Sequence, residues 1–218
     1  MRKVRSKSYQ YIEDLTDAEN QNKLKARENS EKLGLDGISL SKLEAQILQF
    51  HIAGIDAKKI VEIGTLTGLS ALYILECLKS DAFLWTLEKS VEHANRAAEV
   101  LSDYIKKSQC KILVGDAKEQ LKEISGEAPF DVVFIDGNKA AYLDYFNWAV
   151  AHIKTGGLII ADNVFLAGAV WGDQTLQKFN EKQIKVVKEM NQQAFSDKKL
   201  KSIILPTEEG LLICKKLS

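Results

Sequence analysis

Residues 59–72 constrain the fold more than any other stretch of this 218-residue chain. The stretch opens as a short apolar run with β-branched residues, turns at Gly64 and Gly68, and continues with apolar residues at helical spacing from Leu69. This order predicts a strand, a tight turn and a helix. Glycine in such a turn can adopt a positive φ, or it lets a ligand approach the backbone where a side chain would block it. An ordinary strand-to-helix turn with two glycines is the alternative.

The spacing of this motif, Glu-x-Gly-x-x-x-Gly, limits the classes of ligand that the turn is expected to bind. Leu66 occupies the place of the second glycine of a dinucleotide-binding loop. No Gly-Lys-Ser/Thr follows, so the turn is not a phosphate-binding P-loop. The loop therefore suits a ligand without a pyrophosphate or triphosphate. S-adenosylmethionine, which has an adenosine and an amino acid but no phosphate, fits that description.

From residue 58 onward, strand-like apolar runs alternate with helix-like segments. The expected strands are residues 60–63, 83–87, 111–114, 131–135 and 157–161. The expected helices are residues 69–78, 91–105, 117–124 and 142–152, with a longer amphipathic helix over 175–193. This alternation predicts a parallel sheet with helices on both faces. Near the C-terminus, residues 202–205 and 211–214 predict two strands whose short connection requires antiparallel pairing.

The residues before this alternation predict helices. Residues 1–36 form a helical N-terminal extension of one or two helices, packed on the outside of the domain or on a partner subunit. Ser39 or Ser41 could cap the next helix, which ends near Gly54, and Glu44 stands at capping-box spacing from Ser41. The side chains expected to face inward from that helix are Leu43, Ile47, Leu48 and Phe50. With no repeat or linker, residues 1–218 are expected to form a single domain.

Composition excludes several classes of protein. Thirty Lys and Arg residues balance thirty Asp and Glu residues, so no global positive field would attract nucleic acid. Cys77, Cys110 and Cys214 are too few and too scattered for a disulfide framework, which favours a reducing compartment. No apolar run reaches the ~18 residues of a membrane span. A polar segment, rather than a signal-peptide core, follows the basic N-terminus, so a cytoplasmic location is expected.

Every strand of the alternating region ends on an acidic residue. These acids are Glu62, Glu88, Asp116, Asp136 and Asp162, the last beside Asn163. Ligands of open parallel sheets bind beyond the carboxyl ends of the strands. Any one of these acids could simply cap the helix that follows it. Five at one edge of the sheet exceed what capping requires and predict a binding site.

These residues divide into two groups by position. Glu88 lies roughly twenty residues beyond the glycine turn, where an acid can bind ribose hydroxyls, and Asp116 with the backbone of Ala117 could contact adenine. Asp136, Asp162 and Asn163 offer two carboxylates and one amide oxygen, which are hard ligands suited to Mg²⁺. The three histidines lie within predicted helices and match no ligand spacing.

Four stretches carry a resemblance to a known family. They are residues 61–70 (VEIGTLTGLS), 130–139 (FDVVFIDGNK), 156–164 (GGLIIADNV) and 205–211 (LPTEEGL). From about residue 38 to the C-terminus, the chain resembles the metal-dependent class I O-methyltransferases of the catechol and caffeoyl-CoA type, in their small bacterial form. The first stretch is typical of methyltransferases broadly, and the second and third together are typical of the metal-dependent group.

The resemblance implies a Rossmann-like, seven-stranded, mostly parallel α/β sheet whose last strand is antiparallel. It also implies a homodimer. The residues implied to bind S-adenosylmethionine are Leu40 through its backbone, Glu62, Gly64, Thr65, Ser70, Glu88, Asp116, Ala117 and Asp136. Asp136, Asp162 and Asn163 match the ligands of a divalent metal, Mg²⁺ before Mn²⁺ or Ca²⁺. Catalytic roles fall to Asp136 and to Lys139, the lysine beside the acceptor hydroxyl.

Two departures from the family pattern stand near the site. The family usually has Asp-Ala-Asp-Lys where residues 136–139 are Asp-Gly-Asn-Lys, which leaves the ligand and the lysine in place. It often has Asn-Val-Leu-Trp where residues 163–166 are Asn-Val-Phe-Leu, which changes the aromatic wall of the acceptor pocket. Trp171 lies close enough in sequence to replace the missing tryptophan.

We therefore expect methyl transfer to a hydroxyl of a small catechol-like or phenolic acceptor, with a metal aligning the acceptor oxygen and Lys139 taking its proton. One alternative is a tRNA hydroxyuridine O-methyltransferase, in which the Lys/Arg-rich N-terminus and Lys198, Lys199 and Lys201 would contact phosphates. A non-catalytic adenosyl-ligand-binding protein is less favoured, because the metal ligands and the lysine are all present. An NAD-dependent reductase is disfavoured by Leu66.

Overall fold

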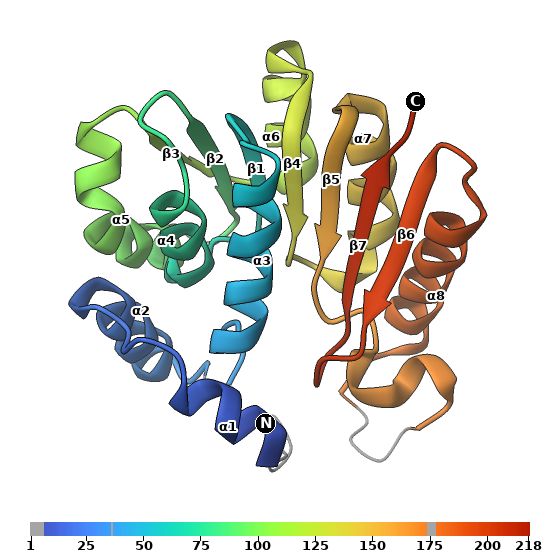
Figure 1. The fold of residues 1–218 in the computed structure, drawn as a ribbon, viewed down its shortest axis with the longest axis horizontal. Helices are drawn as coiled ribbons and strands as arrows, with labels where there is room; N and C mark the ends of the chain where they lie inside the picture. Colours follow the sequence, from blue (N-terminus) through green and yellow to red (C-terminus); the bar gives the residue numbers. More distant parts are fainter. Residues whose placement is uncertain (1–6, 36, 174–177) are drawn as a thin grey trace. The chain divides into compact units, whose positions relative to one another are not determined.

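The computed structural model describes residues 7–35, 37–173 and 178–218. Its strands are β1 (Lys59–Ile63), β2 (Phe83–Glu88), β3 (Cys110–Val114), β4 (Phe130–Ile135), β5 (Ile153–Ala161), β6 (Leu200–Leu205) and β7 (Leu211–Lys216). They form one sheet in the order β3-β2-β1-β4-β5-β7-β6 (Figure 1). The last strand, β7, pairs antiparallel with both β5 and β6. The predicted α/β class and its antiparallel last strand are confirmed.

By its contacts the chain divides into two compact units, residues 1–58 with 65–116 and residues 59–64 with 117–218. Each unit is described by itself, and a single domain over residues 1–218 stays a prediction. Within the described residues, no helix is both long enough and apolar enough to cross a bilayer. All three cysteines are free thiols, as their number and spacing predicted.

In its described residues, the first unit contains two parallel strands and five helices. Its helices are α1 (Lys7–Asp14), α2 (Gln21–Lys32), α3 (Lys42–Gly54), α4 (Leu69–Glu76) and α5 (Val91–Lys106). Strands β2 and β3 pair in parallel, with Leu84 opposite Cys110. The predicted helical extension forms α1 and α2: α1 packs against α3, and α2 packs against α4 and α5. The extension is therefore built into the first unit.

Helix α3 begins as predicted but buries a different set of side chains. Ser41 caps it, and Glu44 completes a capping box by bonding back to the Ser41 backbone. The prediction that Phe50 faces inward is wrong, because its side chain is 77% exposed. The buried apolar stripe runs through Ala45, Leu48 and Ile52 instead. Helical spacing identifies an apolar face, but not how far a neighbour covers it.

The second unit holds the other five strands. Its helices are α6 (Ala117–Ile124), α7 (Tyr142–His152) and α8 (Glu181–Ser196), with 3₁₀ turns η1 (Ser125–Glu127), η2 (Lys139–Ala141) and η3 (Leu166–Trp171). Every residue of β4 is buried, and its apolar run over residues 132–135 is what an interior strand is expected to have. Figure 1 shows α7 and α8 on the same face of β4, β5, β7 and β6, and α7 packs against β4 and β5.

The long helix predicted over residues 175–193 begins later in the chain. Residues 174–177 lie outside the described residues, and α8 runs over Glu181–Ser196. Asn180 has an extended backbone and caps the helix, accepting a hydrogen bond from the Gln183 N–H at 2.9 Å. The Gln183 side chain accepts from the Asn180 N–H in return, at 3.0 Å. This reciprocal capping box starts the helix at residue 181.

Candidate active site

The ends of β4 and β5 bring two aspartates together. The two strands pair in parallel with Ile135 opposite Ala161, so the residues that follow, Asp136 and Asp162, leave the sheet side by side. The Asp162 N–H donates to the Ile135 carbonyl at 3.0 Å. Asp162 is fully buried, whereas the Asp136 side chain is 19% exposed. Two of the predicted metal ligands therefore stand next to each other at one edge of the sheet.

Asn163, the third predicted ligand, has a left-handed backbone conformation. Its φ is +58°, a region that asparagine tolerates better than most residues. Its N–H donates to Asp162 Oδ1 at 2.7 Å. The next two N–H groups, of Val164 and Phe165, donate to the carbonyls of Gly210 and Glu209 at 3.1 and 2.9 Å. The turn between β6 and β7 thus anchors the segment that carries Asn163.

Lys139 lies against the carboxylate of Asp136. Asn138 caps η2 by accepting from the Ala140 N–H at 3.1 Å, which starts the 3₁₀ turn at Lys139. The Lys139 amine donates to Asp136 Oδ1 at 3.0 Å, and its side chain is 13% exposed. The predicted catalytic pair, Asp136 and Lys139, is therefore in direct contact.

Tyr142 sits beneath this contact and was not predicted. Its hydroxyl accepts a hydrogen bond from the Lys139 amine and lies 3.0 Å from the Asp162 carbonyl, to which it donates. The side chain is fully buried. Burial, reinforced by the negative charges of Asp136 and Asp162, raises the pKa of Tyr142 well above its ordinary value. A helix was predicted over residues 142–152, but no role was predicted for Tyr142.

Gly64 packs against the same strand end. It has a φ of +106°, and a Cβ placed on it would lie 2.2 Å from the Asp136 carbonyl oxygen. The Asp136 N–H donates to the Ile63 carbonyl at 2.8 Å. Glycine is therefore required here both by backbone conformation and by the close approach of β4. The first glycine of the predicted ligand loop also shapes the edge that carries Asp136.

The chemistry of this donor set fits a hard divalent cation. Two carboxylates and an amide oxygen are oxygen ligands of the type that Mg²⁺, Mn²⁺ and Ca²⁺ accept. Among the described residues, no group of three or more His, Cys, Asp or Glu side chains is arranged to hold a metal. The predicted set lies outside that description, because its third member is an asparagine. Asp136, Asp162 and Asn163 are the residues that would hold the cation.

In the first unit, Glu88 braces the glycine turn. Its carboxylate accepts from the N–H groups of Leu66 and Ser90, each at 2.8 Å. Leu66 has a φ of +50°, so the turn passes through a second position of positive φ between its glycines. The Gly115 N–H, at the end of β3, donates to the Glu88 carbonyl at 2.9 Å. Glu88 thus stands between the turn and the end of β3, where the sequence placed a ribose contact.

The other predicted cofactor residues of the first unit lie in different settings. Thr65 and Leu40 are almost fully buried, Ser70 is buried in the first turn of α4, and Asp116 is exposed after β3. The Thr65 N–H donates to the Leu87 carbonyl at 3.2 Å. In the second unit, Glu62 is fully buried within β1 and Ala117 opens α6. Their roles as cofactor contacts stay predictions.

An ion pair that the sequence did not reveal holds the Leu40 backbone. Arg27 of α2 forms a two-point contact with Glu19, both N–O distances being 2.6 Å, and also donates to the Leu40 carbonyl at 3.3 Å. The Tyr73 hydroxyl donates to Glu19 at 2.7 Å. Burial works against the Glu19 carboxylate, but hydrogen bonds from Arg27 and Tyr73 outweigh it and lower the pKa of Glu19. No spacing rule links these distant positions.

The segment after Asn163 carries an aromatic pair. The rings of Phe165 and Trp171 pack edge to face, with centroids 5.2 Å apart. Leu166, which stands where the family often has tryptophan, is only 1% exposed, whereas Trp171 is 64% exposed. Leu166 and Ala167 both have positive φ, so the chain kinks between the two aromatic residues. The kink brings Trp171 back to Phe165.

This sheet order, with a glycine turn after β1 and a carboxylate pair beyond β4 and β5, defines a Rossmann-like enzyme. A family model described as O-methyltransferase matches residues 14–217. Catechol O-methyltransferase of Niastella koreensis is 34% identical over 169 residues, 77% of this chain and 76% of the relative. Caffeoyl-CoA O-methyltransferase 1 of Eucalyptus globulus is 28% identical over 80% of this chain and 73% of its own length.

Solved structures agree in fold. The O-methyltransferase TomG of Streptomyces achromogenes, in complex with SAM, has a TM-score of 0.86 at 25% identity, covering 97% of this chain and 96% of that one. The O-methyltransferase of Bacillus cereus, in complex with SAH, has a TM-score of 0.86 at 24% identity, covering 96% of each chain. The chain belongs to the O-methyltransferase family and is an O-methyltransferase. The reductase and the non-catalytic binding protein are thereby set aside.

Proposed function

We propose that this O-methyltransferase takes the methyl group of S-adenosylmethionine and, with a divalent metal, transfers it to a hydroxyl of a small catechol-like or phenolic acceptor. One observation carries the proposal: Asp136 and Asp162 follow the paired ends of β4 and β5, and Asn163 comes directly after Asp162, to whose Oδ1 its N–H donates. The names of the catechol O-methyltransferase relative and of the SAM-bound TomG structure support the acceptor class and the methyl donor.

The chain's own residues divide the work. Asp136, Asp162 and Asn163 would hold the cation, Mg²⁺ in preference to Mn²⁺ or Ca²⁺. When bound, a divalent cation lowers the pKa of a hydroxyl that coordinates it and fixes the position of its oxygen. Lys139, bonded to Asp136 at 3.0 Å, lies beside the ligands and takes the hydroxyl proton. The charge of Asp136 attracts the ammonium group that results.

An aromatic acceptor is favoured by the surroundings of Asn163. The Phe165–Trp171 pair follows the ligand within eight residues of sequence, and most of the Trp171 side chain is accessible. A flat aromatic ring can stack on, or meet edge-on, such a surface. A catechol offers both this ring and two adjacent oxygens for a cation. We propose that this pair serves in place of the tryptophan that the family often has at position 166.

The test compares metal dependence and acceptor class in one assay. Transfer of a radioactive methyl group from S-adenosylmethionine is measured with a catechol panel and, separately, with bulk tRNA. We expect methylation of a catechol that EDTA abolishes and that excess Mg²⁺ restores. Full activity in excess EDTA would exclude the metal role, and transfer to tRNA alone would exclude the small acceptor.

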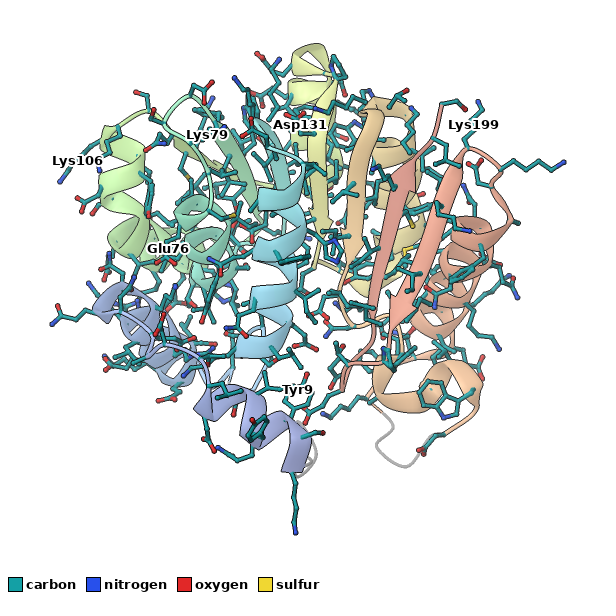
Figure 2. The ribbon with its side chains drawn as sticks, viewed as in Figure 1. Tyr9, Glu76, Lys79, Lys106, Asp131 and Lys199 are labelled. Atoms are coloured by element: carbon teal, nitrogen blue, oxygen red, sulfur yellow. The ribbon has the colours of Figure 1, made fainter. Side chains whose placement is uncertain are left out.

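Of the two basic segments of the tRNA alternative, residues 1–6 lie outside the described residues. The three lysines of the other segment lie away from the predicted metal ligands. Lys198, Lys199 and Lys201 are exposed, and Figure 2 shows Lys199 beside the start of β6. Because β5 and β6 both pair antiparallel with β7, β6 runs in the same direction as β5. These lysines therefore stand at the amino ends of the strands, whereas Asp136 and Asp162 stand at the carboxyl ends. Phosphates bound there would not lie next to the metal ligands.

A homodimer is also proposed. Helices α1 and α3 pack together, and large apolar side chains are exposed on both helices and directly after α1: Tyr11 is 66% exposed, Leu15 70% and Phe50 77%. Covering such side chains would stabilise an association of two copies. Light scattering coupled to size exclusion should give twice the chain mass, and a monomer at micromolar concentration would contradict it. A cytoplasmic location stays an expectation from the free thiols.

A further inference from the structure

The hydroxyl of Tyr142 lies where three parts of the candidate site meet. Lys139 opens η2 and Tyr142 opens α7 three residues later, a spacing that places two side chains on the same side of a helical turn. The Lys139 amine lies 4.5 Å from the centre of the Tyr142 ring and bonds to its hydroxyl. The Asp162 carbonyl is 3.0 Å from the same hydroxyl, and the Ile135 carbonyl is 3.4 Å from it.

The direction of these hydrogen bonds is fixed by what each group can donate. A phenol has one hydrogen, and carbonyl oxygens only accept, so the Tyr142 hydrogen points toward the nearer carbonyl, that of Asp162. The phenol oxygen then faces Lys139 with a lone pair only. It can accept an N–H from the amine but cannot donate to it. Asp136 Oδ1, 3.0 Å away, accepts a second N–H from the same nitrogen.

We infer that Tyr142 is a positioning residue that, together with Asp136, fixes the direction in which the Lys139 amine faces the methyl acceptor. The amine nitrogen is tetrahedral: one position is its own carbon, and Tyr142 and Asp136 take two more. One position remains, and this is the one that can meet the acceptor hydroxyl. The inference rests on the proposed function, because that function places the methyl acceptor beside Lys139.

Without the tyrosine hydroxyl, the amine would have a single anchor. A lysine side chain has many rotamers of similar energy, so one hydrogen bond to Asp136 would not hold the nitrogen in place. Misplacement of a reacting group by about 1 Å can cost on the order of 100-fold in rate. Tyr142→Phe removes the hydroxyl but keeps the ring, so packing in the buried site is retained.

A matched control exists in the same unit. The Ser125 hydroxyl also accepts from a side-chain N–H, that of Trp148 at 3.0 Å, and donates to a carbonyl, that of Leu121 at 2.7 Å. It lies in η1, before β4 begins, and so at the opposite end of that strand. Ser125→Ala therefore removes the same pattern of hydrogen bonds away from the site, and its turnover should match that of the unaltered protein.

The first experiment measures the kinetics of Tyr142→Phe with a catechol acceptor, and the affinity for Mg²⁺ by calorimetry. We expect kcat to fall at least fivefold, while KM and the Mg²⁺ dissociation constant stay within twofold. A smaller fall in kcat would overturn the inference. So would a loss of Mg²⁺ affinity equal to the loss of kcat, because Tyr142 would then act by bracing the Asp162 backbone.

A double variant tests whether Tyr142 acts through Lys139. In a Lys139→Met background, Tyr142→Phe should cause no further loss of kcat, because the amine that it orients is already gone. A full additional loss in that background would overturn the inference.

Crystals separate this inference from the proposed function. In Tyr142→Phe we expect the Lys139 amine to leave its position or to occupy more than one, and an unchanged single position would overturn the inference without any assay. If the unaltered protein shows no metal-dependent transfer to a catechol, the proposed function fails. In that case the crystals alone decide the role of Tyr142.

Discussion

Strand β4 carries an aspartate near each end, and the two differ in their surroundings. Asp131, at the amino end (Figure 2), is 7% exposed, accepts from the Lys59 N–H at 2.6 Å, and forms an ion pair with Lys154. It thereby ties together β1, β4 and β5. Asp136, past the carboxyl end, accepts a hydrogen bond from Lys139, which also donates to Tyr142. Its backbone lies beside that of Asp162. The contacts of Asp131 hold neighbouring strands together. The carboxylates of Asp136 and Asp162 concentrate negative charge, which favours the binding of a cation.

The most direct test of this difference is to replace the aspartate with asparagine at each end of β4 in turn. Asp136→Asn removes a charge from the candidate metal site and keeps the shape of the side chain. We expect kcat/KM to fall by about 100-fold or more, the scale of losing an electrostatic group at a reacting oxygen, with little change in Tm. The measurement is methyl transfer to a catechol at saturating Mg²⁺. Activity within fivefold of the unaltered protein would remove Asp136 from the site.

Asp131→Asn should have the opposite profile. It weakens the bond to the Lys59 N–H and removes the partner of Lys154, at a cost of about 2 kcal/mol in the free energy of unfolding. For a chain of this size that is a fall of roughly 4–8 °C in Tm. Thermal unfolding checks the stability, and turnover at 20 °C should stay unchanged. A loss of turnover in the folded protein would show that the two ends are not functionally distinct.

The ends of β4 also show what the sequence could predict. The strands could be predicted because interior parallel strands are mostly continuous apolar runs. The common location of the acids could be predicted because the carboxyl ends of parallel strands lie at one edge of the sheet. That argument predicted that Asp136, Asp162 and Asn163 would lie together. It could not place Tyr142, because helical periodicity marks a tyrosine as apolar and does not say which carbonyl its hydroxyl reaches.

Other features were hidden for a similar reason. The pairing of Phe165 with Trp171 depends on Leu166 and Ala167 adopting positive φ, and no periodic pattern encodes such a kink. The exposure of Phe50 depends on where neighbouring helices stop. In contrast, Asn180 and Gln183 stand at capping-box spacing in the sequence, so the true start of α8 was readable there.

The smallest predicted effect comes from a comparison of two glycines of the second unit, one within β5 and the other directly before β7. Gly156 (φ +81°), near the start of β5, has open space where a Cβ would stand, whereas a Cβ on Gly210 (φ +77°) would lie 2.5 Å from the Phe165 ring. Alanine at either position costs about 1 kcal/mol for its positive φ. Gly210→Ala must also displace the Phe165 ring, and a packed ring loses contacts when it is displaced.

We therefore expect Gly156→Ala to lower Tm by a few degrees, on the order of 2–4 °C, and to leave the kinetics unchanged. Gly210→Ala should cost roughly 1 kcal/mol more, the scale of overpacking in a buried site. It should also raise KM for the acceptor severalfold, because Phe165 forms part of the proposed acceptor surface. Binding of S-adenosylmethionine, followed by calorimetry, should be unaffected. Equal KM values in the two variants would mean that the acceptor does not rest on Phe165, since both changes impose the same backbone strain and only one displaces the ring.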